Sequence, residues 1–304
     1  MSDIKRVAAL GFFDGVHIGH AALLERTKQR AAERGAIPAV VSFDVHPDNV
    51  VFGGNVRLIN SAEGRRDIIG RLFGIDELLL FHFDRELMQM PWTEFIDMLV
   101  GSYSVVSFVV GHDFRFGYRG EGSAVKLEEY CAAHGLGCDV IPAVTLDGIV
   151  VSSTYIRSLL ESGDMQRAAR YLGHPHVLTD TVRSGFHIGS ALGAPTINMS
   201  FPEGVIVPRR GVYATKVCLE DGGEFRAVTN VGVRPTTGVG RPLNVESHLL
   251  DFSGDLYGRQ ARVEFYAFLR DERKFGSFAE LSAQIAADAE CARIYFDETE
   301  SRLN

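Results

Sequence analysis

The sequence predicts two folds in one chain: an α/β domain built on a doubly wound parallel sheet, followed by a small antiparallel β-barrel that ends in a helix. Three observations support this prediction. The chain has 304 residues, enough for two domains of ordinary size. In its first half, apolar runs alternate with helical stretches, as in parallel strands joined by crossover helices. In its second half, turn residues separate short strands of alternating character.

The first half contains the predicted strands and helices in strict alternation. It opens with the apolar strand RVAAL, and a helix through AALLERTKQRAAER is expected to end at Gly35. Further strands are expected at PAVVSF, ELLLFHF, VVSFVVG and GCDVIPAV, with helices around residues 65–73, 91–100 and 124–134. Short helices near SSTYIRSLLESGDMQRAARYLG close this half. We therefore expect a first domain over residues 1–173 and a second over 174–304.

The second half changes to β-rich segments punctuated by turns. Its expected strands are GVYATKVCL, FRAVTNVGV, NVESHLLDF and ARVEFYAFL. The chain closes with SFAELSAQIAADAECARIYF, where Ser277 is followed three residues later by Glu280. That spacing is a capping box and predicts the start of the terminal helix.

Composition narrows the classes of function. Thirty-one Lys and Arg residues against 39 Asp and Glu residues give a net charge of -8, which argues against a partner with a nucleic-acid backbone. The chain has no apolar stretch of the roughly 18 to 20 residues that a membrane span needs, and its start lacks the pattern of a secretory signal. We expect a cytoplasmic monomer or weak homo-oligomer that acts on small molecules, without a nucleic-acid or membrane partner.

The cysteines do not suggest a metal site. Cys131, Cys138, Cys218 and Cys291 form no C-x-x-C pair, and the nearest two have too few histidines around them to suggest a zinc site. Buried free thiols are therefore expected at these four positions.

The segment GFFDGVHIGH joins the first strand to the first helix, where open α/β sheets bind ligands. Gly11, Gly15 and Gly19 allow close backbone approach, and the N–H groups at the helix start favour phosphate oxygens. His17 and His20 are three residues apart, which places both imidazoles on one face of the first helical turn. They suit hydrogen bonding to a polyphosphate and stabilisation of the charge that develops on it. Ordinary capping and packing is the alternative.

Two later segments fit the same chemistry. In SSTYIR, Ser152, Ser153 and Thr154 offer hydroxyl and N–H groups at a helix start, and Arg157 offers a guanidinium fork one turn later. In DFRFG, two phenylalanines flank an arginine and have the spacing to stack on a planar ligand ring. Each segment alone also fits an ordinary role, as a helix cap or as a pair of core aromatics.

In this order, the three segments resemble a known family. H-x-G-H after a first strand resembles the nucleotidyltransferase superfamily, which has a Rossmann-like fold, and the longer string GFFDGVHIGH resembles the FMN adenylyltransferase domain of prokaryotic bifunctional FAD synthetases. VVGHDFRFGYRGEG resembles the flavin-contacting loop of that domain, and VSSTYIR its phosphate-binding motif. The resemblance implies ATP-phosphate contacts from the residues His17, His20, Arg157, Gly11, Gly19, Ser152, Ser153 and Thr154. It implies flavin contacts from Phe13, Asp14, Asp113 and Phe114.

A second glycine-rich loop, SGFHIGSALGAPTIN, lies in the second half. Gly189, Ser190 and Gly193 are candidates to meet phosphate, although the loop lacks the G-K-[ST] of a Walker P-loop. Thr196 and Asn198 follow at a spacing of two, which puts both side chains on one face of an extended strand. Their oxygens suit Mg²⁺ bound together with ATP phosphates, while a plain strand start after a turn is the alternative.

Together with NVGVRPTTG and NVESHLLDFSGDLYG, this loop resembles the riboflavin kinase domain of the same bifunctional family. The resemblance implies that Glu246 is the general base for the ribityl 5′-hydroxyl; taken alone, it reads as a solvated strand glutamate. The family loop has an arginine and an aromatic residue where this chain has Ser190 and Ala194. We expect the kinase step to persist with weaker nucleotide or flavin binding, and its loss is the alternative.

The sequence thus predicts an enzyme that uses ATP and Mg²⁺ to convert riboflavin to FMN and FMN to FAD. One alternative is another H-x-G-H adenylyltransferase, acting on pantetheine phosphate or a nicotinamide nucleotide. Others are an FMN adenylyltransferase with an impaired kinase domain and a non-catalytic flavin or nucleotide sensor.

Overall fold

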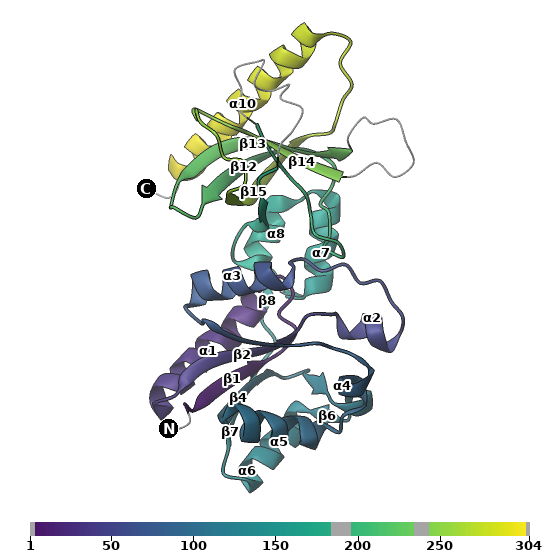
Figure 1. Ribbon diagram of the computed structural model, residues 1–304, viewed down its shortest axis with the longest axis vertical. Coiled ribbons are helices and arrows are strands. Elements are labelled where there is room, and N and C mark those ends of the chain that lie inside the picture. The colour runs from purple at the N-terminus through teal and green to yellow at the C-terminus, as the bar shows by residue number, and fades with distance from the viewer. Residues whose placement is uncertain (1–3, 184–195, 234–242, 302–304) are drawn as a thin grey trace. The chain divides into compact units, whose positions relative to one another are not determined.

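The computed structural model describes residues 4–183, 196–233 and 243–301 and divides the chain into two compact units, residues 1–153 and 154–304 (Figure 1). The two short helices near residue 160 belong to the second unit by this division. The sequence placed the domain boundary after them, at residue 173, and that boundary stays a prediction.

The first unit is an open sheet of five parallel strands in the order β3-β2-β1-β4-β7. The strands are β1 (Arg6–Leu10), β2 (Ile37–Phe43), β3 (Glu77–Phe81), β4 (Val105–Gly111) and β7 (Gly137–Ile141). The helices are α1 (Ile18–Arg34), α2 (Pro47–Val51), α3 (Ala62–Phe73), α4 (Arg85–Gln89), α5 (Trp92–Tyr103) and α6 (Ala124–Ala133). Minor elements are β5 (Arg115–Phe116), η1 (Tyr118–Gly120), β6 (Gly122–Ser123), β8 (Thr145–Leu146) and β9 (Ile149–Val150). The predicted doubly wound sheet is confirmed.

Each face of this sheet has its own core. Leu24 of α1 and Ile68 of α3 belong to a buried cluster on one face, with Val7 from β1. Ile96 of α5 and Leu127 of α6 belong to the cluster on the other face. Because side chains alternate along a strand, β1 supplies both clusters.

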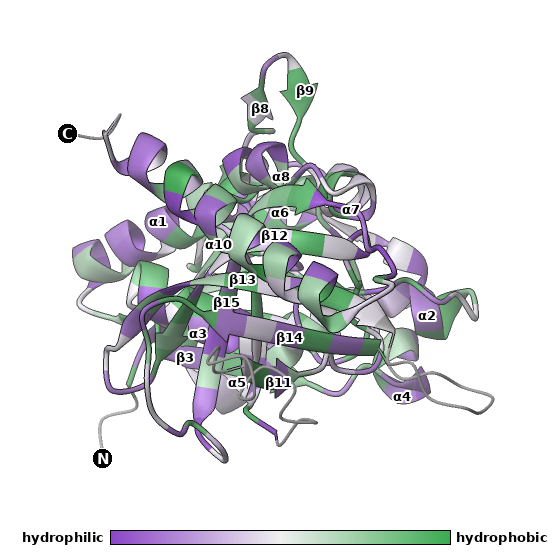
Figure 2. Cartoon of the chain, turned by 90° about the horizontal axis from the view of Figure 1, so that it is seen from above, coloured by the Kyte–Doolittle hydropathy of each residue, from purple (hydrophilic) through white to green (hydrophobic). Residues whose placement is uncertain are grey.

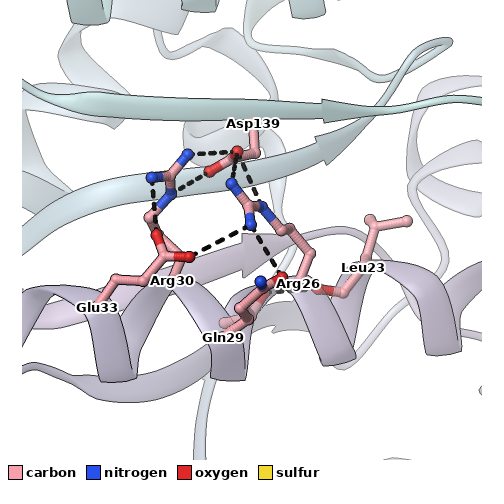
Figure 3. Close-up of polar contacts among 7 residues, drawn as sticks. Leu23, Arg26, Gln29, Arg30, Glu33 and Asp139 are labelled. Carbon is pink, nitrogen blue, oxygen red and sulfur yellow. Dashed lines mark hydrogen bonds and ion pairs between the residues drawn. The ribbon is translucent and has the colours of Figure 1, made fainter.

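Helix α1 is fixed at its end and along its length. Gly35 caps it in the left-handed conformation, with φ of 57°, as the sequence predicted. Arg26 and Arg30 donate to Asp139 of β7, each with an Nη2 to Oδ1 distance of 2.7 Å (Figure 3). Burial raises the pKa of Asp139, but the bonds from Arg30 and Arg26 outweigh that effect and hold it below its ordinary value. The ion pairs therefore tie α1 to the edge strand of the sheet.

The second unit is an antiparallel sheet of six strands in the order β10-β15-β12-β13-β14-β11. A further antiparallel bridge joins Arg183, just after β10, to Asn198 of β11, so the two edge strands meet and close a barrel. The strands are β10 (His176–Thr181), β11 (Thr196–Met199), β12 (Gly211–Leu219), β13 (Glu224–Val233), β14 (Leu243–Leu249) and β15 (Gln260–Arg270). The helices are α7 (Ser153–Ser162), α8 (Met165–Leu172) and α10 (Phe278–Ser301).

Helix α10 covers the barrel with one side. Its hydrophobic residues are interspersed with hydrophilic ones (Figure 2), and Ala289, Ala292 and Phe296 pack on β12, β13 and β15. The predicted cap is confirmed, since the Ser277 hydroxyl accepts from the Glu280 N–H at 3.2 Å. The predicted antiparallel barrel with a terminal helix is therefore present.

The expectation of four buried thiols is wrong in part. Cys131 and Cys218 are buried, but Cys138 is half-buried and Cys291 is exposed. Cys291 lies between the packed residues Ala289 and Ala292 in sequence, and 100° per residue turns it away from the barrel. None of the described helices is long and apolar enough to cross a membrane.

Candidate active sites in the two units

The turn between β1 and α1 has an unusual backbone. Phe13, Gly15 and Val16 have φ of 57°, 81° and 44°, all in the left-handed region. Glycine adopts that region freely, but phenylalanine and valine do so at a cost that the surroundings must offset. Strain of this kind collects at functional sites and marks the turn as a candidate.

The two histidines of the turn stack on each other. His17 is the N-cap of α1, and its Nδ1 accepts from the His20 N–H at 3.2 Å. Because Nδ1 accepts this bond, it carries no proton, and the N–H of the His17 ring is on Nε2. The His17 and His20 ring centroids are 3.6 Å apart, and the Phe13 ring lies 5.0 Å from His20. Burial, together with His17 and Arg65, holds the pKa of His20 well below its ordinary value, so His20 is neutral.

The residues between the glycines hold the turn in place. Phe13 and Asp14 are both buried. The Asp14 carboxylate accepts from the Ile59 N–H at 2.7 Å and so fastens the loop before α3. The Asp14 carbonyl accepts from the Ser153 hydroxyl at 2.9 Å. The structure thus brings the start of the S-S-T-x-I-R segment to the H-x-G-H turn.

The rest of that segment runs into α7. Ser152 precedes the helix and is half-buried, Thr154 is exposed, and Arg157 lies about one turn after Ser153. Their order along one helix start is that of a phosphate-binding helix N-terminus.

The loop after β4 emerges beside the turn because β4 and β1 are neighbours in the sheet. The Asp113 side chain is exposed, and Phe114 is half-buried and stacks on Phe116 with centroids 5.0 Å apart. Phe116 belongs to the core below. Phe116 is therefore a core residue, whereas the Phe114 ring lies nearer the surface, at the edge of the sheet where ligands bind.

No motif in the sequence marks the loop that follows β2. Phe52 is 78% exposed, and the His46 ring meets the Phe12 ring with centroids 4.8 Å apart. No motif marks the buried Arg65 of α3 either, which reaches the same region. The spacing of Arg65 to Ile68 and Ile69, three and four residues on, was a signal that its side chain shares their buried face.

In the barrel, the candidate kinase residues lie on neighbouring strands. Asn198 of β11 pairs directly with Glu246 of β14, and Asn230 of β13 pairs with Glu246 on its other side. Directly opposed residues of antiparallel strands point to the same face with Cβ atoms about 4.5 to 5.5 Å apart. Asn198 is buried, and its Oδ1 accepts from Asn244 Nδ2 at 3.0 Å. Thr196 lies two residues before Asn198, on the same face.

These residues fit a magnesium ion shared with nucleotide phosphates. Their hydroxyl, amide and carboxylate oxygens are the donors that Mg²⁺ prefers, and it commonly takes only one or two protein ligands beside phosphates and water. No group of three His, Cys, Asp or Glu side chains suited to a metal occurs among residues 4–183, 196–233 and 243–301. Gly189, Ser190 and Gly193 lie outside the described residues.

Comparison with known proteins matches both units. A family model described as FAD synthetase matches residues 1–155, and one described as riboflavin kinase matches residues 172–296. Proteins named bifunctional riboflavin kinase/FMN adenylyltransferase are 31% identical in Listeria monocytogenes and 37% identical in Pseudomonas fluorescens. The first comparison covers 98% of this chain and 95% of the relative, and the second covers 94% and 92%. A crystal structure titled macrolide-efflux protein, from Streptococcus pneumoniae, matches with a TM-score of 0.83 and 27% identity, covering 96% of this chain and 95% of that one.

Proposed function

Because this chain belongs to the family of bifunctional riboflavin kinase/FMN adenylyltransferases, we propose that each unit supplies the residues for one of its two reactions. The enzyme phosphorylates riboflavin to FMN and adenylylates FMN to FAD. The barrel performs the first reaction and the α/β unit performs the second. The observation that carries this division is that each unit has its own cluster of phosphate-compatible side chains.

Adenylyl transfer takes place at the turn between β1 and α1. Gly11 and Gly19 let the backbone approach the ATP phosphates, and the Nε2–H of His17 donates to a phosphate oxygen. Neutral His20 supports His17 by stacking and adds a second imidazole at the same place. Ser152 and Ser153, at the end of the first unit, supply further donors. Thr154 and Arg157 belong to the second unit by the same division, and their contacts with ATP stay a prediction.

The FMN phosphate is the nucleophile and attacks the α-phosphate of ATP in line, so that pyrophosphate leaves. This phosphate is already ionised at neutral pH, so no general base is needed. The residues therefore act by holding the reactants and stabilising charge on the leaving pyrophosphate. Asp113 and Phe114 face the flavin, while the buried Phe13 and Asp14 shape the turn beside its phosphate.

Riboflavin phosphorylation takes place on the Asn198–Glu246 face of the barrel. Glu246 accepts the proton of the ribityl 5′-hydroxyl as that oxygen attacks the γ-phosphate of ATP, and the bond to the bridging oxygen breaks so that ADP leaves. Thr196 and Asn198 would hold Mg²⁺. When bound, the metal neutralises phosphate charge.

Product analysis tests the proposal. Purified protein with riboflavin, ATP and Mg²⁺ is expected to yield FMN and then FAD by liquid chromatography. His20→Ala should block FAD formation from supplied FMN and spare FMN formation from riboflavin. Glu246→Gln should block FMN formation from riboflavin and spare FAD formation from supplied FMN. His134→Ala and Glu220→Gln, at exposed positions, are the matched controls. Failure of the wild-type protein to convert either riboflavin or FMN contradicts the proposal, as does a loss of both activities in either single variant.

The remaining properties are proposed on the same basis. The protein works as a monomer or weak homo-oligomer in the cytoplasm, without a nucleic-acid or membrane partner, which light scattering and cell fractionation can test. The kinase step persists despite Ser190 and Ala194. Its KM for ATP or riboflavin is expected to fall when Ser190→Arg restores the family arginine.

A further inference from the structure

Arg65 of α3 is a buried cation close to the adenylylation turn. Only 1% of its surface is exposed. Its Nη1 donates to the Phe12 carbonyl at 2.5 Å and to the Ser42 hydroxyl at 2.7 Å, and its Nη2 donates to the Phe43 carbonyl at 2.7 Å. Burying a guanidinium is costly unless such bonds replace its water. This cost needs an explanation.

No salt bridge among the described residues offsets the cost of burying this guanidinium. The hydrogen-bond acceptors of Arg65 among the described residues are two backbone carbonyls and one hydroxyl, and its Nε has no partner there. Asp14, Asp44 and Glu63 act on it only through longer-range attraction. Burial lowers the pKa of Arg65 against that attraction, although not enough to remove the charge of a guanidinium. The contacts fix two carbonyls rather than neutralise a charge.

The two carbonyls belong to the loops that follow neighbouring strands. Phe12 follows β1, and Phe43 ends β2. The guanidinium also lies over the Phe12 ring, 4.4 Å from its centroid. A planar fork with several donors can satisfy both carbonyls at once, which a single ammonium group cannot do in the same geometry. Arg65 therefore links the turn to the adjacent loop at the ligand-binding edge of the sheet.

The Phe12 carbonyl lies directly before the strained residue of the turn. It accepts a second bond, from the Ser42 hydroxyl at 2.8 Å. These two donors fix the peptide between Phe12 and Phe13, and Phe13 has the unfavourable φ of 57°. A strained conformation persists only where surrounding contacts over-determine it. The Phe13 ring then lies against His20, which stacks on His17.

We propose that Arg65 is a positioning residue for adenylyl transfer, because it holds the turn in the strained form that aligns His17 and His20 with the nucleotide. This inference rests on the proposed function of the turn. Arg65 acts through Phe12 and Phe13 and does not itself touch the reacting phosphates.

The test uses the full-length bifunctional chain, whose kinase activity reports on the folding of the same sample. Arg65→Met is expected to lower kcat for FAD formation about 100-fold, the order of loss that a displacement of about 1 Å can cause. The KM for FMN should change by less than about threefold, because the fault lies in alignment. The kcat of Arg65→Lys for FAD formation should lie between those of Arg65→Met and wild type. FMN formation should stay within about twofold in both.

Two further variants separate positioning from simple destabilisation. Ser42→Ala removes one of the two donors to the Phe12 carbonyl and should lower the adenylylation kcat severalfold without unfolding the unit. Arg66→Met, at the exposed neighbouring position, is the matched control and should leave both activities unchanged. The side-chain NMR signals of His17 and His20 should shift in Arg65→Lys and Ser42→Ala but not in Arg66→Met.

Different results would contradict the proposed function of the turn and the positioning role of Arg65. If wild-type protein forms no FAD, the proposed function of the turn fails. If wild-type protein forms FAD and Arg65→Lys and Ser42→Ala keep the wild-type kcat and unshifted histidine signals, Arg65 has no positioning role. Should Arg65→Met not fold, the Lys and Ser42→Ala variants still decide the question.

Discussion

His176 of β10 should make the barrel sensitive to acid. It is 1% exposed, and its ring lies near those of Phe201 and Phe265, with centroid distances of 6.1 and 5.7 Å. Neither ring nitrogen has a hydrogen-bond partner among the described residues. Burial, assisted by neighbouring His174, lowers the pKa of His176 from 6.5 to about 3. The folded barrel therefore holds this imidazole neutral down to about pH 3, whereas in the unfolded chain the imidazole takes up a proton near pH 6.5.

The size of the effect follows from linkage. Below pH 6.5 the unfolded state binds a proton that the folded state refuses, so the free energy of unfolding falls as the pH falls towards 3. At about 1.4 kcal/mol per pKa unit, the loss is about 2 kcal/mol at pH 5 and approaches about 5 kcal/mol below pH 3. Above pH 6.5 the group contributes no pH dependence.

His176→Phe should remove this loss, because a phenyl ring fits among the two phenylalanines and does not titrate. Hydrogen exchange of β10 and β15 amides at pH 7.5 and pH 5, corrected for intrinsic rates, measures the free energy of opening of the barrel alone. The loss on acidification should be smaller by about 2 kcal/mol in the variant than in wild type. Phe265→Leu is the control, since it should weaken the barrel at both pH values and keep the wild-type difference. An equal loss in wild type and His176→Phe would refute the reasoning.

Three further predictions concern stability. Asp139→Asn should lower the free energy of unfolding of the first unit by about 1 to 3 kcal/mol in urea titrations, because it removes the charged acceptor of two arginines (Figure 3). Gly117→Ala should cost at least about 2 kcal/mol more than Gly135→Ala by the same assay. Both glycines have φ near 70°, but the new Cβ lies 2.5 Å from Trp92 Cα at the first and meets nothing within 4 Å at the second. Thr229→Val should lower the melting temperature of the barrel, because the buried Thr229 hydroxyl bonds to two other buried hydroxyls at 2.7 Å.

The parts of the fold that depend on local pattern could be predicted from the sequence. The alternation of apolar runs and helices predicted the parallel sheet, and Gly35 marked the end of α1. The capping box predicted the start of α10. In each case, the residues that determine the structure lie within a few positions of one another, so the sequence contains the whole signal.

The parts that depend on distant contacts could not be predicted. Asn198 and Glu246 are far apart in sequence, and only the strand order of the barrel makes them direct neighbours. The sequence predicted a buried thiol at Cys291, but the packing of α10 on the barrel leaves this residue exposed. The burial of Arg65 has a local signal in its helical spacing, but charged residues are rarely buried, so the spacing alone does not predict it.

Burial of an unpartnered polar group does not by itself mark a functional site, as a comparison of two histidines makes clear. His176 and His20 both have a ring nitrogen that is buried without a partner among the described residues, and both have a lowered pKa. His176 lies among phenylalanine rings in a regular strand, so the cost of burying it affects only the stability of the barrel. His20 lies in the first turn of α1, after the left-handed residues Phe13 and Val16 of the turn that follows β1. Only the second setting combines strain with a helix N-terminus suited to anions, and that combination is why we propose His20, and not His176, as a residue of the adenylylation site.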